Sequence, residues 1–281
     1  MTEFNAATNL ETYDAPAVVA HYAALNYLTP CERLLFDTYV PAGIAILDLG
    51  VGGGRTTAYL ARRASRYVGV DNAAAMVEAC RAKFPGREFA VADAADLSAF
   101  PDASFDVIVF AFNGIDFVLP ASSRRRCLEH MRRILKAGGV AIFSSHNARS
   151  VFVRPSWNSE RLRRVAQRFS GDFKVLYQLL LILLTVARAA AAWAQCAWAT
   201  LLRLFQRVPS RVFWRGEGSL VDSAHGGLLT HYWTPRRAIA ELAEVRLQPL
   251  RILGDDYPRP SHTYVTDWYY YVFAKPSDPV N

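Results

Sequence analysis

A glycine-rich turn at residues 46–54 constrains the fold more than any other feature of this 281-residue sequence. The segment reads Ile-Leu-Asp-Leu-Gly-Val-Gly-Gly-Gly, so an apolar run of strand length ends in a cluster of glycines. Glycines at such a turn let the backbone bend tightly and approach a ligand closely. A helix pattern follows at residues 55–64. The segment therefore predicts a buried strand whose carboxyl end turns into a helix beside a ligand site.

Apolar runs of strand length alternate with helix patterns after this turn. The predicted strands are residues 44–49, 67–71, 88–92, 105–111 and 140–145, and the predicted helices are residues 55–64, 73–83 and 122–136. This alternation predicts a doubly wound, mostly parallel α/β sheet. Gly138 and Gly139 are expected to end the last of these helices, because glycine readily adopts the left-handed conformation of a helix cap. Two short helices, broken at Pro30, are expected over residues 15–39.

The alternation stops after Ser145 and resumes with a predicted helix at residues 234–243 and strands near 245–253 and 266–275. Thr234 and Pro235 suit the N-cap and first position of that helix. We therefore expect four parts: a helical cap (1–40), a ligand-binding α/β core (41–147), an inserted helical, basic lobe (148–230), and a final helix and strands (231–281). The last part would complete a seven-stranded Rossmann-like sheet, with the lobe inserted between its strands 5 and 6.

The net charge of +7 is concentrated in the lobe, because residues 149–215 carry twelve Arg and Lys but only two acidic residues. A basic segment can bind nucleic acid. Here the charge flanks an apolar stretch, residues 175–202, whose only charged residue is Arg188. Nucleic-acid modules usually interleave basic residues with exposed aromatic ones, so no nucleic acid is expected.

Polar residues recur along this apolar stretch at a mean step near 3.6, which predicts an amphipathic helix or helix pair. Three roles stay open for it: a lid on the domain, a homodimer contact, and a peripheral membrane contact through residues 161–211. A membrane-spanning helix is the least favoured interpretation.

The four cysteines are widely separated singletons at positions 31, 80, 127 and 196, and we expect reduced thiols and no metal site. The first fourteen residues lack the basic and apolar regions of a secretory signal. We therefore expect a cytoplasmic protein, peripheral to the inner face of the membrane if the lobe binds lipid.

The run from Asp48 to Gly54 resembles the D-x-G-x-G-x-G first motif of class I methyltransferases, which bind S-adenosylmethionine. The resemblance covers about residues 10–147 and is nearest to methyltransferase-domain proteins of bacterial glycan and natural-product pathways. It implies S-adenosylmethionine as cofactor and S-adenosylhomocysteine as product. Asp71 would accept hydrogen bonds from the ribose hydroxyls. The resemblance further implies that Asp93 meets the adenine amino group.

The cofactor-binding residues expected on these grounds are Tyr22, Asp48, Gly50, Gly52, Gly54, Asp71, Asn72, Asp93, Ala94, Phe112 and Asn113. Both aspartates could instead only cap helices. An alternative cofactor, NAD, would require a small residue where Arg55 stands in the G-x-G-x-x-G pattern.

Methyl transfer to oxygen usually needs a general base, whereas a neutral amine needs mainly alignment. His146 follows the strand at residues 140–145 and is the first candidate base, with Asp116 as the carboxylate alternative. His225 and His231 are further candidates. The residues expected to bind the acceptor are Asn113, Asp116, His146, Tyr232 and Trp233.

The sequence therefore predicts a methyltransferase acting on an oxygen or nitrogen of a small molecule: a sugar-containing, lipid-linked or natural-product intermediate. Two alternatives stay open. One is a non-catalytic cofactor-binding or membrane-associated scaffold protein, and the other is an NAD-linked oxidoreductase.

Overall fold

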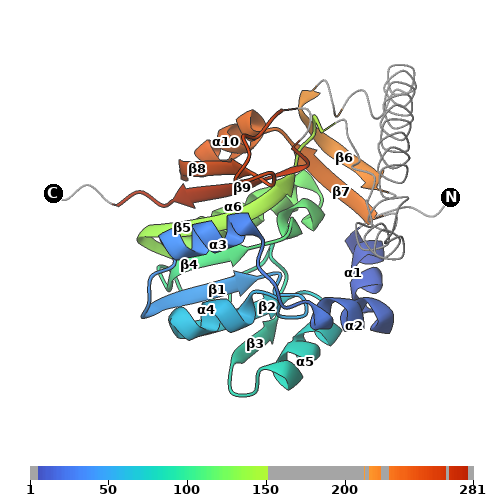
Figure 1. Cartoon of the computed structure of the whole chain (residues 1–281), viewed down its shortest axis with the longest axis vertical. Coiled ribbons are helices and arrows are strands. Elements are labelled where there is room, and N and C mark those ends of the chain that lie inside the picture. The colour runs from blue at the N-terminus through green and yellow to red at the C-terminus, as the bar shows by residue number, and fades with distance from the viewer. Residues whose placement is uncertain (1–5, 151–211, 213–214, 223–227, 264–265, 278–281) are drawn as a thin grey trace, which may run out of the picture. The chain divides into compact units, whose positions relative to one another are not determined.

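A seven-stranded sheet forms the centre of the protein in the computed structural model, which describes residues 6–150, 212, 215–222, 228–263 and 266–277. These residues belong to one compact unit formed by the chain before residue 151 and after residue 210. The sheet strands are β1 (Ile44–Leu49), β2 (Ala64–Asp71), β3 (Glu88–Val91), β4 (Phe105–Phe110), β5 (Leu135–His146), β8 (Gln248–Gly254) and β9 (Trp268–Ala274), shown in Figure 1.

The strand order is β3-β2-β1-β4-β5-β9-β8. Strands β1 to β5 pair in parallel, and β9 runs antiparallel to both β5 and β8. The predicted mostly parallel, doubly wound sheet of seven strands is confirmed. Strand β1 lies in the middle of the parallel strands and its last four residues are buried, as its unbroken apolar sequence predicts.

Helices cover both faces of the sheet and bury two apolar clusters. The helices are α1 (Ala6–Asp14), α2 (Pro16–Ala24), α3 (Pro30–Tyr39), α4 (Thr57–Arg63), α5 (Ala74–Lys83), α6 (Ala121–Ile134) and α10 (Pro235–Glu244), with a short 3-10 helix, η1 (Gly114–Phe117). Helices α6 and α10 pack with one cluster, and α3, α4 and α5 pack with the other. Each face of the sheet is therefore covered, as parallel strands require.

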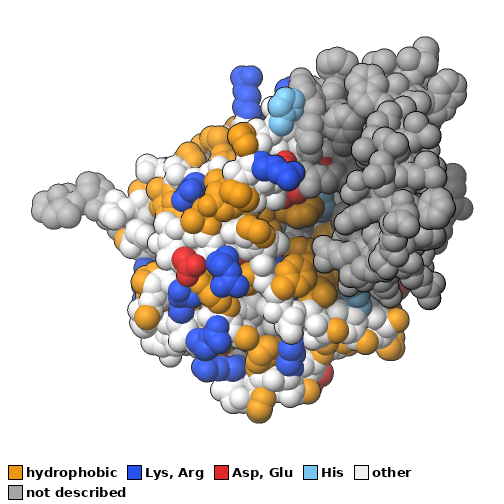
Figure 2. Space-filling view, in the orientation of Figure 1, with side chains coloured by type: hydrophobic (Ala, Val, Ile, Leu, Met, Phe, Trp, Pro, Cys, Tyr) orange, Lys and Arg blue, Asp and Glu red, His pale blue; other side chains and the backbone are white. Residues whose placement is uncertain are grey.

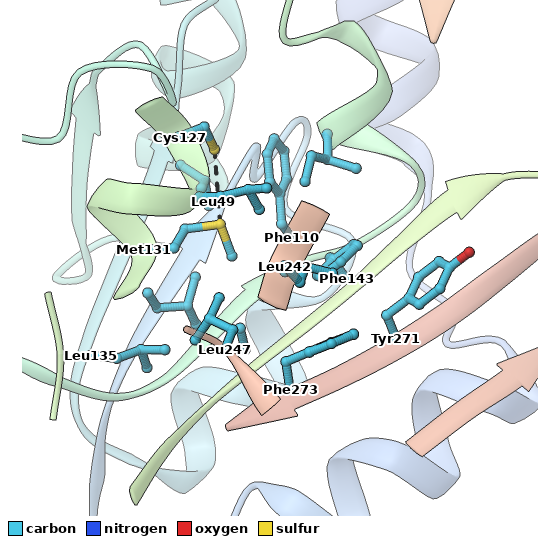
Figure 3. Packing of buried hydrophobic residues seen from close by; sticks show 14 of the residues in the cluster. Leu49, Phe110, Cys127, Met131, Leu135, Phe143, Leu242, Leu247, Tyr271 and Phe273 are labelled. Carbon is cyan, nitrogen blue, oxygen red and sulfur yellow. Dashed lines mark hydrogen bonds between the residues drawn. The ribbon is translucent and has the colours of Figure 1, made fainter. Parts of the chain in front are cut away.

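Aromatic rings from β5 and β9 fill the cluster under α6 and α10 (Figure 3). Phe143 stacks on Tyr271 with 5.2 Å between the ring centroids, and on Phe273 at 6.1 Å. All five central residues of β9 are buried, because helices or strands cover both of its faces. Strand β9 is thus buried on both sides.

The N-terminal helices confirm the predicted break at Pro30, and α1 is an additional helix that the sequence did not predict. Thr29 and Glu32 form a capping box at the start of α3: the Thr29 side chain accepts from the Glu32 N–H, and the Glu32 carboxylate accepts from the Thr29 N–H. Pro30 takes the first helical position, where its missing N–H costs nothing.

The predicted helix end at Gly138 and Gly139 is wrong. Helix α6 ends at Ile134, and β5 begins at Leu135, which is buried and pairs with Phe105 of β4. The register of β4 and β5 shifts immediately after this pair, and Gly138 has a φ of +73°. The glycines therefore form an irregularity inside the strand, and burial of Leu135 decides where the helix stops.

A hairpin of β6 (Glu217–Asp222) and β7 (Leu228–Trp233) lies mostly within residues that were expected to form the helical lobe. Its register pairs Glu217 with Trp233, and Asn147 bridges to the same tryptophan. The described end of the predicted lobe is thus β structure. The helix after it begins at Pro235 as predicted, although the Thr234 side chain makes no capping hydrogen bond.

The apolar stretch and most of the basic segment predicted for the lobe lie outside the described residues. Of the helices that are described, none is long and apolar enough to cross a bilayer. On the coloured part of the face in Figure 2, Lys and Arg side chains stand between hydrophobic and neutral ones. The cysteines at 31, 80 and 127 are buried free thiols, and the fourth lies outside the described residues.

Candidate active site

The glycine turn after β1 forms one wall of a pocket at the carboxyl ends of the parallel strands. Gly50, Gly52 and Gly54 have φ values of +63°, +53° and +76°, which L side chains rarely adopt. A Cβ added to Gly52 would have only the Tyr22 ring within 4 Å, at 4.0 Å. The space beside Gly52 is therefore open, as expected for a backbone cradle that a ligand approaches.

Nine of the expected cofactor residues line this pocket, which we call the glycine-loop pocket: Tyr22, Asp48, Gly50, Gly52, Asp71, Asn72, Asp93, Ala94 and Phe112. Gly54 and Asn113 are not among its lining residues. A Cβ on Gly54 would clash with the Phe84 ring at 2.5 Å, so this glycine serves the packing of α5 against the turn.

Asp71, the last residue of β2, ties the turn to the neighbouring strand. Its Oδ2 accepts from the Gly52 N–H at 2.8 Å and its Oδ1 accepts from the Ala73 N–H at 3.0 Å. Asp93 accepts from the Ala95 N–H at 2.8 Å and is exposed at the pocket edge. Both aspartates thus organise local backbone, as the capping alternative required, and both also line the pocket.

Asp48 brings a buried carboxylate to the same pocket. It is 1% exposed, and its Oδ2 accepts from the Thr56 hydroxyl at 2.7 Å and the Tyr67 hydroxyl at 2.8 Å. Burial raises its pKa to about 6, although the two hydroxyl donors act in the opposite direction. The nearby Arg55 charge also favours ionised Asp48, but burial outweighs it, so a further cationic group in the pocket would make ionisation less costly.

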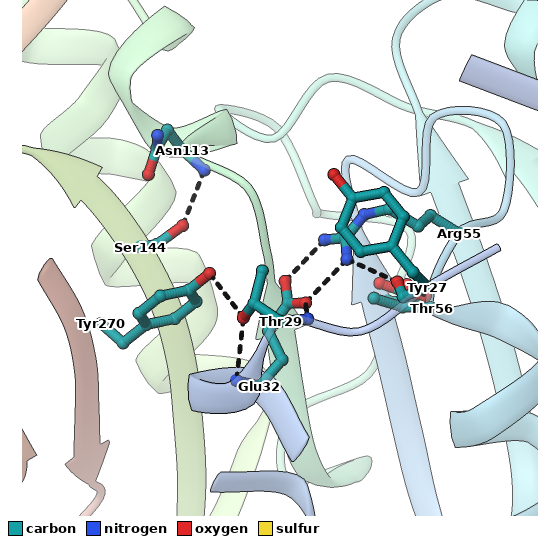
Figure 4. Close-up of polar contacts among 9 residues, drawn as sticks. Tyr27, Thr29, Glu32, Arg55, Thr56, Asn113, Ser144 and Tyr270 are labelled. Carbon is teal, nitrogen blue, oxygen red and sulfur yellow. Dashed lines mark hydrogen bonds and ion pairs between the residues drawn. The ribbon is translucent and has the colours of Figure 1, made fainter. Parts of the chain in front are cut away.

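Arg55, whose side chain is 8% exposed, joins α3 to the pocket (Figure 4). Its guanidinium donates to Glu32 through Nη1 at 2.7 Å and Nη2 at 2.5 Å, and Nη1 also donates to the Tyr27 carbonyl. The same group lies over the Tyr27 and Phe112 rings. Sequence reasoning treated Arg55 only as an obstacle to NAD, because its partner Glu32 is 23 positions away.

The N-terminal helices form the opposite wall, with Tyr13 and Tyr22 lining the pocket. Their rings meet edge to face at 6.0 Å. A Cβ on Gly53 would lie 2.3 Å from the α2 backbone, so the turn and α2 touch directly. Lys83 adds hydrogen bonds to the Ala23, Leu25 and Gly53 carbonyls. The sequence suggested such a cap but could not give these contacts.

Two consecutive left-handed residues, Phe112 and Asn113, follow β4 with φ values of +58° and +64°. This conformation is strained for residues with side chains. The Asn113 N–H donates to the Ser144 hydroxyl of β5 at 2.8 Å, which holds the turn in place (Figure 4). Phe112 consequently points its ring toward the Arg55 guanidinium, 4.7 Å away.

His146 and Asp116 meet at the end of β5. His146 Nδ1 lies 2.7 Å from Asp116 Oδ2, and the His146 backbone N–H donates to the same oxygen at 2.8 Å. The Ser145 hydroxyl donates to the other carboxylate oxygen. Asn113 Nδ2 is 3.2 Å from His146 Nε2, so the structure brings three predicted residues together.

Two of the other residues predicted for catalysis or acceptor binding are fully buried. Asp116 is fully buried, so its carboxylate cannot itself meet an acceptor as the alternative base. Trp233 is also fully buried and belongs to the core, not to an acceptor surface. The Tyr232 ring lies 5.3 Å from the His146 ring.

His231 lies in a second pocket beside Arg124 and Glu241, and does not line the glycine-loop pocket. Burial lowers its pKa to about 3, with a smaller effect of Arg124 in the same direction. An imidazole with so low a pKa is a weak base at neutral pH, which argues against the predicted role. His225 lies outside the described residues.

The glycine-loop pocket fits the two ends of S-adenosylmethionine. Asp71 and Asp93 bring two carboxylate acceptors to the pocket, and Gly52 leaves room for close approach of a ligand. Asp48 adds a buried carboxylate to the same pocket. Acceptor groups, an open backbone cradle and negative charge therefore occur together, as this cofactor requires.

Comparisons with known proteins agree with this fit. Residues 46–139 match a family described as "Methyltransferase domain". Over 101 residues the chain is 39% identical to demethylmenaquinone methyltransferase of Clavibacter sepedonicus, covering 35% of this chain and 39% of that protein. It is 32% identical over 127 residues to trans-aconitate 2-methyltransferase of an Acidovorax species, covering 44% and 46%. The chain thus spans less than half the length of these two relatives.

A solved structure extends the likeness in fold. It is Burkholderia thailandensis 1,6-didemethyltoxoflavin-N1-methyltransferase with its acceptor and S-adenosylhomocysteine bound, which matches with a TM-score of 0.56 at 12% identity. The match covers 97% of this chain and 87% of that one. At this identity the comparison supports the architecture alone.

The pKa of Asp48 predicts a pH-dependent effect of Asp48→Asn on stability. The folded pKa of about 6 exceeds the ordinary aspartate pKa of 3.8, so the stability from the protonated group is complete below pH 3.8. This contribution to the free energy of unfolding, about 3 kcal/mol, is lost as pH rises through 6. Urea unfolding at pH 4 to 7 should show the variant gaining about this much relative to the wild type. Parallel curves for the two proteins would contradict the assignment.

Proposed function

Residues 46–139 form a class I, S-adenosylmethionine-dependent methyltransferase domain, and we propose that the whole chain transfers the methyl group of this cofactor to a small-molecule acceptor. The open space beside Gly52, in a pocket that also holds Asp71 and Asp93, carries the proposal. A turn with a purely structural role would have no need of this space between two acceptor carboxylates.

Each end of the cofactor has its own residues in this proposal. Asp71 accepts hydrogen bonds from the ribose hydroxyls, while Asp93 and the Ala94 backbone N–H recognise the adenine. Gly52 gives room to the methionine portion, Gly50 lines the pocket beside it, and Asp48 balances the positive charge of the methionine portion. The cofactor supplies an electrophilic methyl group on a sulfonium. The protein needs no covalent nucleophile and contributes chiefly alignment and proton removal.

The proposed acceptor atom is an oxygen or nitrogen of a sugar-containing, lipid-linked or natural-product intermediate. The two curated relatives, named for demethylmenaquinone and trans-aconitate, support a small-molecule acceptor. His146 is the proposed base, because it is the histidine held by a buried carboxylate at the carboxyl edge of the sheet. A peripheral membrane contact or homodimer contact through residues 161–211 stays part of the hypothesis, as does a cytoplasmic location.

The second candidate function is a non-catalytic protein that binds the cofactor. The buried His146 and Asp116 pair favours an enzyme, since a binding protein has no use for an oriented imidazole next to the pocket. Isothermal titration with S-adenosylhomocysteine, combined with an assay for methyl transfer, separates the two functions. Tight binding of NADH without affinity for S-adenosylhomocysteine would instead support the oxidoreductase alternative.

Gly52→Ala tests the cofactor cradle. Its Cβ would enter the open space, and we expect S-adenosylhomocysteine to bind about 100-fold more weakly or worse in isothermal titration. Gly86→Ala is the matched control, because Gly86 has a φ of +82° and equally free surroundings but is not in the pocket. Both variants carry similar backbone strain. Equal affinities in the two variants would mean that the Gly52 turn is only structural.

Asp93→Ala tests the adenine contact against Asp96→Ala. Each aspartate accepts a backbone N–H two residues later, but only Asp93 lines the pocket. A charge-assisted hydrogen bond at this exposed position should contribute about 1.5 kcal/mol, or roughly tenfold in affinity. We expect that loss in the Asp93 variant and unchanged binding in the Asp96 variant. Equal losses would assign both carboxylates to the loop alone.

A further inference from the structure

We propose that His146 and Asp116 form a general-base pair that makes a hydroxyl group the methyl acceptor of this enzyme. The inference rests on the proposed methyltransferase function. It narrows the acceptor atom from an oxygen or nitrogen to the oxygen of a neutral hydroxyl group. It depends on the hydrogen bonds around one imidazole and on where that imidazole lies.

The partners of His146 fix which ring nitrogen carries the proton. Asp116 accepts at Oδ2 from both the His146 backbone N–H and Nδ1, at 2.8 and 2.7 Å. An ionised carboxylate only accepts, so Nδ1 is the protonated nitrogen. On the other side of the ring, Asn113 Nδ2 donates toward Nε2 at 3.2 Å. The lone pair of the neutral imidazole is therefore at Nε2.

Asp116 can act only through His146. It is fully buried, and its second oxygen accepts from the Ser145 hydroxyl. Burial raises the pKa of Asp116, while the hydrogen bonds and charge of His146 oppose that rise. A proton arriving at Nε2 would create a positive charge beside this carboxylate, where low polarity strengthens their attraction. Asp116 is thus a positioning residue, which orients the His146 ring through the hydrogen bond at Nδ1.

The pair adjoins the glycine-loop pocket through Asn113. The residues on either side of Asn113, Phe112 and Gly114, both line that pocket. Among the described residues, Asn113 Oδ1 is a buried oxygen without a hydrogen-bond partner. An acceptor hydroxyl that reaches Nε2 would replace the Asn113 amide there. Asn113 Oδ1 would then be an acceptor for a second polar hydrogen of the substrate.

The proton balance distinguishes acceptor classes. A hydroxyl gives its proton to Nε2 as its oxygen electron pair forms the bond to the methyl carbon. The carbon–sulfur pair remains on sulfur, so one positive charge disappears at the sulfonium and one appears on the imidazolium. That proton later leaves to solvent. A neutral amine already has an available electron pair, and a carboxylate has no proton to lose, so neither needs the base for bond formation.

Nitrogen NMR of the full chain labelled with ¹⁵N-histidine tests the pair without any acceptor. Two-bond N–H correlations at neutral to mildly alkaline pH should show His146 protonated at Nδ1 and unprotonated at Nε2. Asp116→Ala should abolish this preference, and His146→Gln identifies the signal. A wild-type His146 protonated at Nε2 would overturn the proposal.

Transfer of radiolabelled methyl to 2-naphthol and to 2-naphthylamine gives the second test. We expect the hydroxyl probe to be preferred and His146→Gln to slow its methylation by about 100-fold or more. His130→Gln, on α6, should leave the rate unchanged. Equal methylation of the hydroxyl probe by wild type and His146→Gln would overturn the proposal.

The two proposals fail in different ways. S-adenosylhomocysteine should bind His146→Gln within about threefold of the wild type, because His146 does not line the glycine-loop pocket. No binding by the wild type would contradict the proposed function itself. Binding together with an Nε2–H His146 would overturn only the base pair. The NMR result decides the inference even if neither naphthyl probe is methylated.

Discussion

The hydrogen bond from the Gly52 N–H to the Asp71 carboxylate, 2.8 Å long, is the interaction on which the site depends. It joins the turn after β1 to the end of β2, and it can form because the two strands pair in parallel with Leu49 opposite Val70. The left-handed conformation of Gly52 directs its N–H toward Asp71 and leaves the pocket side free of a side chain. One contact thus shapes the cradle and places a carboxylate at its rim.

The parallel pairing of the strands also determines where the proposed base lies. Phe110 of β4 pairs with Phe143 of β5, so the residues after both strands reach the same edge as the glycine turn. Ser144 then holds the strained turn at Asn113, and His146 meets Asp116 of η1. The glycine-loop pocket and the proposed base are therefore neighbours, because their strands end at the same edge of the sheet. Arg55 adds a link from α3 by pairing with Glu32 beneath the Phe112 ring.

The sequence correctly predicted the features that depend on the local pattern of apolar, glycine and acidic residues. It predicted the β1 turn, the alternation of strands and helices, and the carboxylates at positions 71 and 93. The sequence prediction failed where contacts between distant residues determine the structure. Leu135 pairs with β4, so β5 begins there and α6 ends before it. Trp233 joins the core because β9 supplies aromatic neighbours. The partnership of His146 and Asp116 was also missed. Both residues were identified, but 30 positions separate them, and they were treated as rival bases.

The central claim is that the glycine-loop pocket binds the cofactor with its reacting end toward His146. A crystal structure of the full chain with S-adenosylhomocysteine tests it most directly. The account predicts ribose hydroxyls within hydrogen-bond distance of Asp71, the adenine beside Asp93, and the sulfur on the side of Phe112 and Asn113. Ligand bound elsewhere, or bound here with its sulfur turned away from the His146 edge, would contradict the account.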